Sequence, residues 1–192
     1  MKLSTDELRD VVDKFSLAFS GHDAIDWFIA KTKRIGRKRW SRFLNLLRQI
    51  RFFGSITFIA SENETDWLNE PKTLKWHAND ADVVGLYRAQ DHWIELIVSR
   101  MTSWSRMEAV LRHELVHLLQ DVTFDGSRKD VQAWAKAGNL IRPYGKRAAK
   151  FDEAVEAEAY WLMNRPGEVT READKIINQP YRWRNWFCSI NS

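Results

Sequence analysis

Hydrophobic positions in the first quarter of the chain repeat at helical spacing. Ser4-Thr5-Asp6-Glu7 has the Ser-x-x-Glu form of a capping box, and the apolar residues that follow it predict a helix. Gly21-His22-Asp23 predicts a break, with Asp23 capping a second helix. Gly36 then precedes a third helix, whose apolar face holds Trp40, Phe43, Leu44, Leu47 and Ile50. Residues 4–51 are therefore expected to be helical.

The pattern changes to that of strands in residues 52–100. Ile56-Thr57-Phe58-Ile59 is a short apolar run rich in residues that favour strands. The segments 82–88 and 92–98 flank the polar Ala89-Gln90-Asp91, which is the pattern of a β-hairpin. The middle of the chain therefore predicts a small, mainly antiparallel sheet of three or four strands.

The last part of the chain returns to helical spacing. Ser105-Arg106-Met107-Glu108 matches a second capping box, and the helix that it opens should run to about Asp121. Further helices are expected at about 128–137, 146–164 and 168–178. The predicted fold class is α+β, with a helical region at 1–51 and a core at 52–192.

Composition narrows the class of protein. The chain has 192 residues, of which 44% are hydrophobic and 29% charged, as expected of one compact domain or of a core with a helical arm. The single cysteine, Cys188, excludes an internal disulfide and a cysteine-based zinc finger. No apolar run is long enough for a membrane span, and the N-terminus lacks the apolar stretch of a signal peptide. We therefore expect a cytoplasmic protein with no membrane partner.

Positive charge is concentrated in one window. No acidic residue occurs between Asp26 and Glu62. The basic residues inside this acid-free window are Lys31, Lys33, Arg34, Arg37, Lys38, Arg39, Arg42, Arg48 and Arg51. Trp27, Trp40 and Phe43 are interleaved with them. Residues 31–51 could bind nucleic acid or an acidic protein, or form a solvated helix face whose arginine stems cover apolar neighbours.

The motif with the clearest chemistry is His113-Glu114-Leu115-Val116-His117. Four residues separate the two histidines, so on a helix both imidazoles project from one face. That spacing suits two nitrogens on one Zn²⁺ ion, at roughly 2.0–2.1 Å each. Glu114, rotated by about 100° from His113, could reach a metal-activated water without being a ligand. The alternative is a pair of incidental helix histidines.

A third ligand must come from elsewhere, and no histidine follows His117. If it lies downstream, it is a carboxylate or Cys188. The helix expected from about Lys146 carries a cluster of acids at Asp152, Glu153, Glu156 and Glu158. Glu153, Glu156 and Tyr160 share one face of that helix, beside small alanines that permit close packing. A solvated acidic surface is the alternative interpretation.

The stretch His113-Glu-Leu-Val-His117-Leu-Leu-Gln, with Glu156-Ala157-Glu158-Ala159-Tyr160, resembles the gluzincin metallopeptidases. Within them it is most similar to minimal forms such as the ImmA/IrrE-like group, which carry a Glu-x-x-Ala motif on a "glutamate helix". The resemblance implies a minimal zincin-like core, with His113 and His117 as zinc ligands, Glu114 as general base and Glu156 as third ligand; Glu153 is the alternative. Ala159 matches the family's alanine, whereas Tyr160 stands where the group usually has Asn or Asp.

The expected function is therefore that of a zinc metalloendopeptidase acting on a protein or peptide. Tyr160, Tyr144 and His92 are candidate hydrogen-bond donors to the oxyanion, and Asp121 could orient His117. The strand at 93–98 could bind an extended substrate by edge pairing.

Two other functions stay open. One is a nucleic-acid-associated protease that uses residues 31–51. The other is a catalytically silent assembly protein, suggested by the dense aromatic residues of 181–187.

Overall fold

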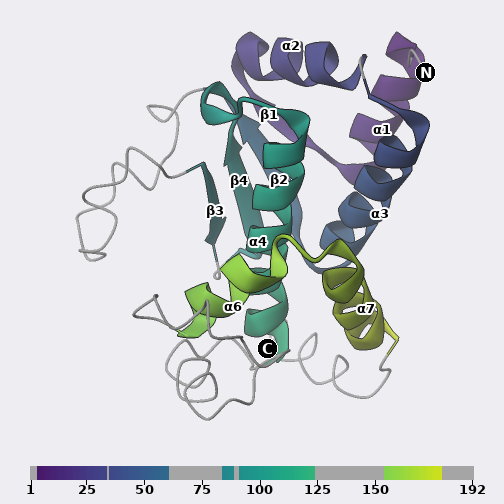
Figure 1. Cartoon of the computed structure of the whole chain (residues 1–192). Helices are drawn as coiled ribbons and strands as arrows, with labels where there is room; N and C mark the ends of the chain where they lie inside the picture. The colour runs from purple at the N-terminus through teal and green to yellow at the C-terminus, as the bar shows by residue number, and fades with distance from the viewer. Residues whose placement is uncertain (1–3, 34, 61–83, 89–90, 124–153, 179–192) are drawn as a thin grey trace, which may run out of the picture. The chain divides into compact units, whose positions relative to one another are not determined.

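A computed structural model of the chain describes residues 4–33, 35–60, 84–88, 91–123 and 154–178 (Figure 1). The chain divides into two compact units, Met1–Leu111 and Arg112–Ser192, and the division falls inside helix α4, Trp104–Thr123. Helices and one four-stranded sheet make up the described residues, so the predicted α+β class is confirmed.

The first helix starts as the capping box predicts. In α1, Thr5–Phe15, the Ser4 Oγ atom accepts a hydrogen bond from the Glu7 backbone N–H, and the Ser4 N–H donates to the Glu7 carboxylate. The helix ends earlier than expected, at Ser16, which adopts the left-handed conformation with φ 50°. Ala18–Ser20 then forms strand β1, and α2, Gly21–Thr32, begins before Asp23. The predicted cap at Asp23 and the helical assignment of residues 18–20 are therefore wrong.

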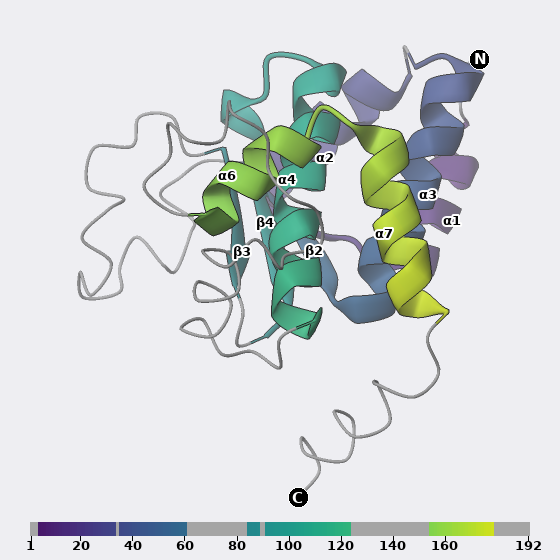
Figure 2. The same cartoon turned by 60° about the horizontal axis from the view of Figure 1, so that its bottom comes forward.

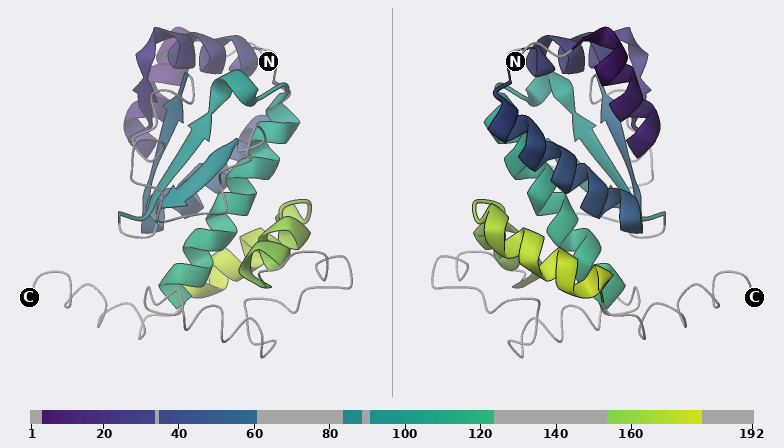
Figure 3. Two further views of the ribbon diagram at one scale, coloured as in Figure 1. Left: turned by 90° about the vertical axis from the view of Figure 1, so that its left-hand side faces the viewer. Right: turned by 90° about the vertical axis from the view of Figure 1, so that its right-hand side faces the viewer.

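The sheet is mixed rather than mainly antiparallel, with the strand order β1-β2-β4-β3 (Figure 3). Strand β2, Ser55–Ile59, pairs in parallel with both β1 and β4, Trp93–Ile97. Only the predicted hairpin of β3, Gly85–Arg88, with β4 is antiparallel. The parallel β1–β2 pair needs a crossover, which α2 and α3, Arg37–Phe53, supply. Because β4 pairs on both sides, it is no edge strand, and the expected edge pairing at 93–98 is wrong.

An aromatic cluster packs the helices of the first unit against its sheet. The rings of Phe28 on α2 and Phe58 on β2 lie 5.2 Å apart, and Phe43 on α3 lies 4.7 Å from Trp104 at the start of α4. Phe43 and Trp40, two of the aromatics in the basic window, are buried. The cations of α3 are exposed, and we name them the α3 basic surface: Arg37, Lys38, Arg39, Arg42, Arg48 and Arg51.

Helix α4 carries the His-Glu-x-x-His motif and begins one residue before the predicted cap. The Ser103 Oγ atom accepts from the Arg106 N–H at 3.2 Å, so Ser103, not Ser105, caps this helix. A short 3-10 helix, Val98–Arg100, precedes it.

The described part of the second unit continues with α6, Ala154–Leu162, and α7, Pro166–Ile177, joined by a short turn (Figure 2). The helix predicted at 128–137 and the start of the one at 146–164 lie outside the described residues. Among the helices that the structure describes, none is long and apolar enough to cross a membrane.

Gly54 lies at a close approach between the end of α3 and the turn before β4. The Ser55 N–H donates to the His92 carbonyl at 3.1 Å, and a Cβ atom on Gly54 would overlap that carbonyl. His92 itself has a φ of 49°, and its Nδ1 atom lies 2.7 Å from the Tyr87 hydroxyl.

We expect Gly54→Ala to lower the free energy of unfolding by about 1–3 kcal/mol, because the His92 backbone must move to admit the methyl group. The measurement is urea denaturation followed by circular dichroism. Gly167→Ala is the matched control, since a Cβ atom at this second residue of α7 meets nothing within 4 Å and alanine has a higher helix propensity than glycine. Equal stability of the two variants would contradict the prediction.

Candidate metal centre

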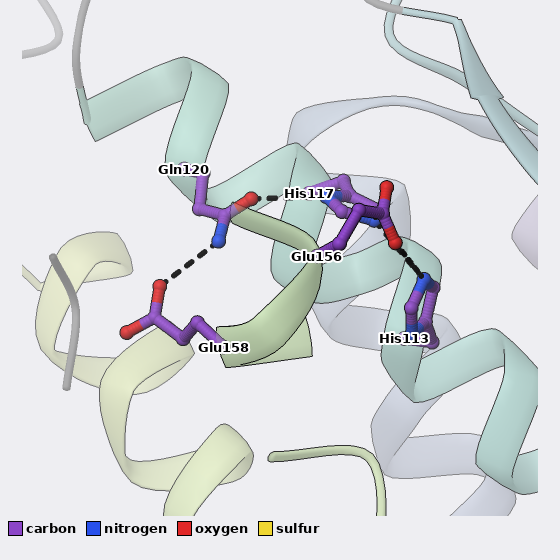
Figure 4. Close-up of polar contacts among 5 residues, drawn as sticks. All are labelled: His113, His117, Gln120, Glu156 and Glu158. Carbon is purple, nitrogen blue, oxygen red and sulfur yellow. Dashed lines mark hydrogen bonds and ion pairs between the residues drawn. The ribbon is translucent and has the colours of Figure 1, made fainter. Parts of the chain in front are cut away.

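Two imidazoles from α4 meet at the centre of the site (Figure 4). His113 and His117 lie one helical turn apart, and their Nε2 atoms are 3.1 Å from each other. Their side chains are only 12% and 15% exposed. Leu111, Leu115 and Leu118 of the same helix are fully buried, so α4 is anchored by its apolar positions while the histidines face the site.

Glu156 of α6 completes the group from a second helix. Its Oε2 atom lies 3.3 Å from the Nε2 atom of His113, and its Oε1 atom lies 3.2 Å from the Nε2 atom of His117. The carboxylate thus spans both imidazoles (Figure 4). Of the two glutamates considered from sequence, Glu156 is the one that the structure brings to the histidines, whereas Glu153 lies outside the described residues. Ala159, three positions later, is fully buried.

The spacing of these atoms fits a bound metal ion. One ligand atom from each of His113, His117 and Glu156 can be chosen so that all lie within 4.8 Å of one another. The facing atoms are 3.1–3.3 Å apart, and ligands on a tetrahedral ion with bonds of roughly 2.0–2.1 Å are about 3.3–3.4 Å apart. A metal ion could therefore enter with only small side-chain movements.

Opposite charges couple the side chains of this group. Burial by itself would lower the pKa of His117, but the charge and hydrogen bond of Glu156, with help from Glu114 and Gln120, raise that pKa to about 9. Burial likewise opposes ionisation of Glu156, yet His117 and the hydrogen bonds from both imidazoles hold the pKa of this carboxyl far below its usual value. The imidazolium of His117 and the carboxylate of Glu156 therefore form an ion pair.

The predicted catalytic side chains lie around the same group. Glu114 is 5% exposed and close enough for its charge to act on His117. Tyr160, on α6, is 46% exposed, and its ring lies 4.6 Å from the ring of His113. Of the other candidate donors, Tyr144 lies outside the described residues and His92 belongs to the first unit, where it contacts Tyr87.

Two polar residues to which the sequence analysis gave no role extend the group: Gln120 contacts His117, and Glu158 contacts Gln120. The Oε1 atom of Gln120 lies 2.9 Å from the Nδ1 atom of His117, and its Nε2 atom donates to the Oε2 atom of Glu158 at 2.9 Å (Figure 4). The residue that contacts the Nδ1 atom of His117 is thus Gln120 and not the predicted Asp121. The signal available in the sequence was the position of Gln120, three residues after His117 on the same helix.

Comparisons with protein families, with curated proteins and with solved structures found no match for this chain. The resemblance to gluzincins therefore depends on the quoted motifs alone and stays a prediction. What the structure adds is a group of two histidines and one glutamate with the geometry to hold a metal ion.

Because His117 keeps its proton up to about pH 9, a metal ion must displace that proton to bind. We expect release of about one proton per ion at pH 7.5, and an affinity that rises about tenfold per pH unit between pH 7 and 9 before levelling off. Calorimetric titration with Zn²⁺ in two buffers of different ionisation enthalpy measures the proton count. The His22→Gln variant, changed at an exposed histidine, should behave like wild type. Binding without proton release would contradict the expectation.

Proposed function

We propose that the protein is a zinc-dependent peptidase. The observation that carries this proposal is the meeting of His113, His117 and Glu156, with the buried carboxylate of Glu114 beside them. Two imidazoles and one carboxylate suit the borderline softness of zinc, and three protein ligands leave a coordination position open, as catalytic zinc sites do. The resemblance to gluzincins favours the same assignment.

In this proposal His113, His117 and Glu156 hold the ion. When bound, zinc supplies a Lewis acid that lowers the pKa of water and polarises a peptide carbonyl. Glu114 takes the proton of the attacking water and passes it to the leaving amine. Its neighbour on the helix is the ligand His113, so the base and the ion share one rigid element. Tyr160 donates a hydrogen bond to the oxygen that becomes negative.

We expect Glu114→Gln to lower kcat by at least about a hundredfold while the bound zinc is kept, because only the proton acceptor is removed. Tyr160→Phe should lower kcat by about 10- to 100-fold, also with its zinc kept. The measurements are cleavage of a mixed library of quenched fluorescent peptides and zinc content by elemental analysis. Glu168→Gln, on α7, is the matched control for loss of a carboxylate.

A different outcome would favour the catalytically silent alternative. If wild-type protein with one zinc per chain cleaves no peptide of the library, the metal group is structural. Loss of zinc in Glu114→Gln would instead show that this residue supports the site rather than acting as its base.

The α3 basic surface favours an additional function, and we propose that it binds the phosphates of double-stranded nucleic acid. Arg37, Lys38 and Arg39 occupy the first turn of α3, the positive end of the helix dipole, where cations are unfavourable. Helix stability therefore does not explain them. Trp40 and Phe43 are buried, so they are not available to stack on unpaired bases. Binding through charge to a duplex backbone is the mode that these exposed side chains suit.

We expect the triple variant Arg37→Ala, Lys38→Ala, Arg39→Ala to bind a labelled random-sequence DNA duplex at least about tenfold more weakly. The slope of log affinity against log salt concentration should also become shallower, because up to about three fewer counterions are released on binding. Fluorescence anisotropy over a range of salt concentrations measures both. The control removes three exposed cations of the same unit, Arg9, Lys14 and Arg106. No wild-type binding at low salt would sink the proposal, and binding of a polyglutamate peptide instead would point to an acidic protein.

A further inference from the structure

Glu158 is a fully buried carboxylate that takes no part in holding the metal. Its relative exposure is 0%, and that of its partner Gln120 is 2%. A buried carboxylate is costly unless hydrogen bonds satisfy it. One donor to it is the Nε2 atom of Gln120, on α4, at 2.9 Å. The pair thus places a carboxyl group and an amide beside the candidate metal centre (Figure 4).

The carboxylate determines which way the amide of Gln120 points. The Nε2 atom of Gln120 donates to the carboxyl group of Glu158, so the NH₂ group of this amide faces Glu158. The carbonyl oxygen then faces the Nδ1 atom of His117, 2.9 Å away. This oxygen only accepts hydrogen bonds, so Nδ1 must carry a hydrogen. When His117 is neutral, the lone pair is therefore on Nε2, the atom that faces Glu156 and His113.

We propose that Glu158 and Gln120 are positioning residues that fix the ring and the tautomer of His117 for metal binding, an inference that rests on the proposed metal site. The chain Glu158–Gln120–His117 does through an amide what a directly bonded carboxylate does for many metal-binding histidines. Each hydrogen bond of this series also polarises the next, which makes the imidazole a better ligand.

One short helix supplies both the third ligand and this support. Glu156 and Glu158 are two residues apart on α6, so their side chains leave the helix in different directions, one to the imidazoles and one to Gln120 (Figure 4). The Nε atom of Arg112, on α4, donates to the Met163 carbonyl just beyond α6 at 2.6 Å. This bond holds α6 beside the histidines, so ligand and support move together.

The two histidines differ in the hydrogen bonding of their Nδ1 atoms. The Nδ1 atom of His113 is buried and has no hydrogen-bond partner among the described residues. His117, by contrast, is held through Gln120. Loss of the hydrogen-bond chain should therefore act on the metal through His117.

The experiment reverses the direction of the hydrogen bond between residues 120 and 158. Gln120→Glu alone sets two buried carboxylates against each other, and we expect zinc affinity to fall by about 10- to 100-fold. Adding Glu158→Gln restores an acceptor toward His117 and a donor toward residue 120, so the double variant should return to within about threefold of wild type. Zinc alone is the probe, with affinity measured by competition with a chromophoric chelator. The cobalt absorption spectrum of each variant reports ligand geometry. Glu172→Gln, a buried glutamate on α7, is the control.

Thermal unfolding of the metal-free variants tells a positioning role from a merely structural one. Rescue of both stability and zinc affinity in the double variant supports the proposal. Rescue of stability alone overturns the proposal, because the hydrogen bonds from Glu158 to His117 then stabilise the fold without acting on the metal. Absence of rescue in both overturns it as well, and so does a wild-type protein that binds no zinc. Zinc binding with rescue but without peptide cleavage would refute only the peptidase.

Discussion

The site depends on one constraint, which is that two imidazoles of a single helix are held within hydrogen-bond distance of each other. The rise of α4 places His113 and His117 one turn apart, and their nitrogens meet at 3.1 Å. Burial disfavours the protonated form of His117, so a counter-charge is needed beside it. Glu156 supplies it, and the same carboxylate serves either a proton or a metal ion. In the proposed site a metal ion would compete with the proton of His117 for this position, and α6 supplies the carboxylate in either case.

Much of this arrangement was predictable because it follows from helical spacing. The four-residue interval of His113 and His117 puts them on one face whatever the rest of the fold, and Glu114 necessarily follows beside them. The hairpin of β3 and β4 and the start of α3 after Gly36 are likewise local consequences of turn residues and periodicity. That Glu156 approaches the histidines was inferred from a family resemblance, and the structure gives the distances.

Tertiary contacts determined what the sequence analysis missed. Phe19 fits the apolar spacing of a helix, yet it lies in β1, where its ring stacks on Phe58 at 5.2 Å. The parallel pairing of β1 with β2 follows from that packing and not from any local signal. The sequence analysis placed Glu158 in an acidic cluster without giving it a role, and only the position of α6 beside α4 shows it to be buried against Gln120. Residues far apart in the chain carry no spacing from which such a pair could be inferred.

The two-residue interval between Glu156 and Glu158 has a consequence for recognising related chains. A one-residue insertion or deletion between them would rotate one side chain by about 100° and separate the ligand from its support. If Gln120 and Glu158 position His117 as we propose, the signature of this centre is longer than His-Glu-x-x-His. It is His-Glu-x-x-His-x-x-Gln on one helix and Glu-x-Glu on another, and a chain with only the first five residues would need a different way to orient its second histidine.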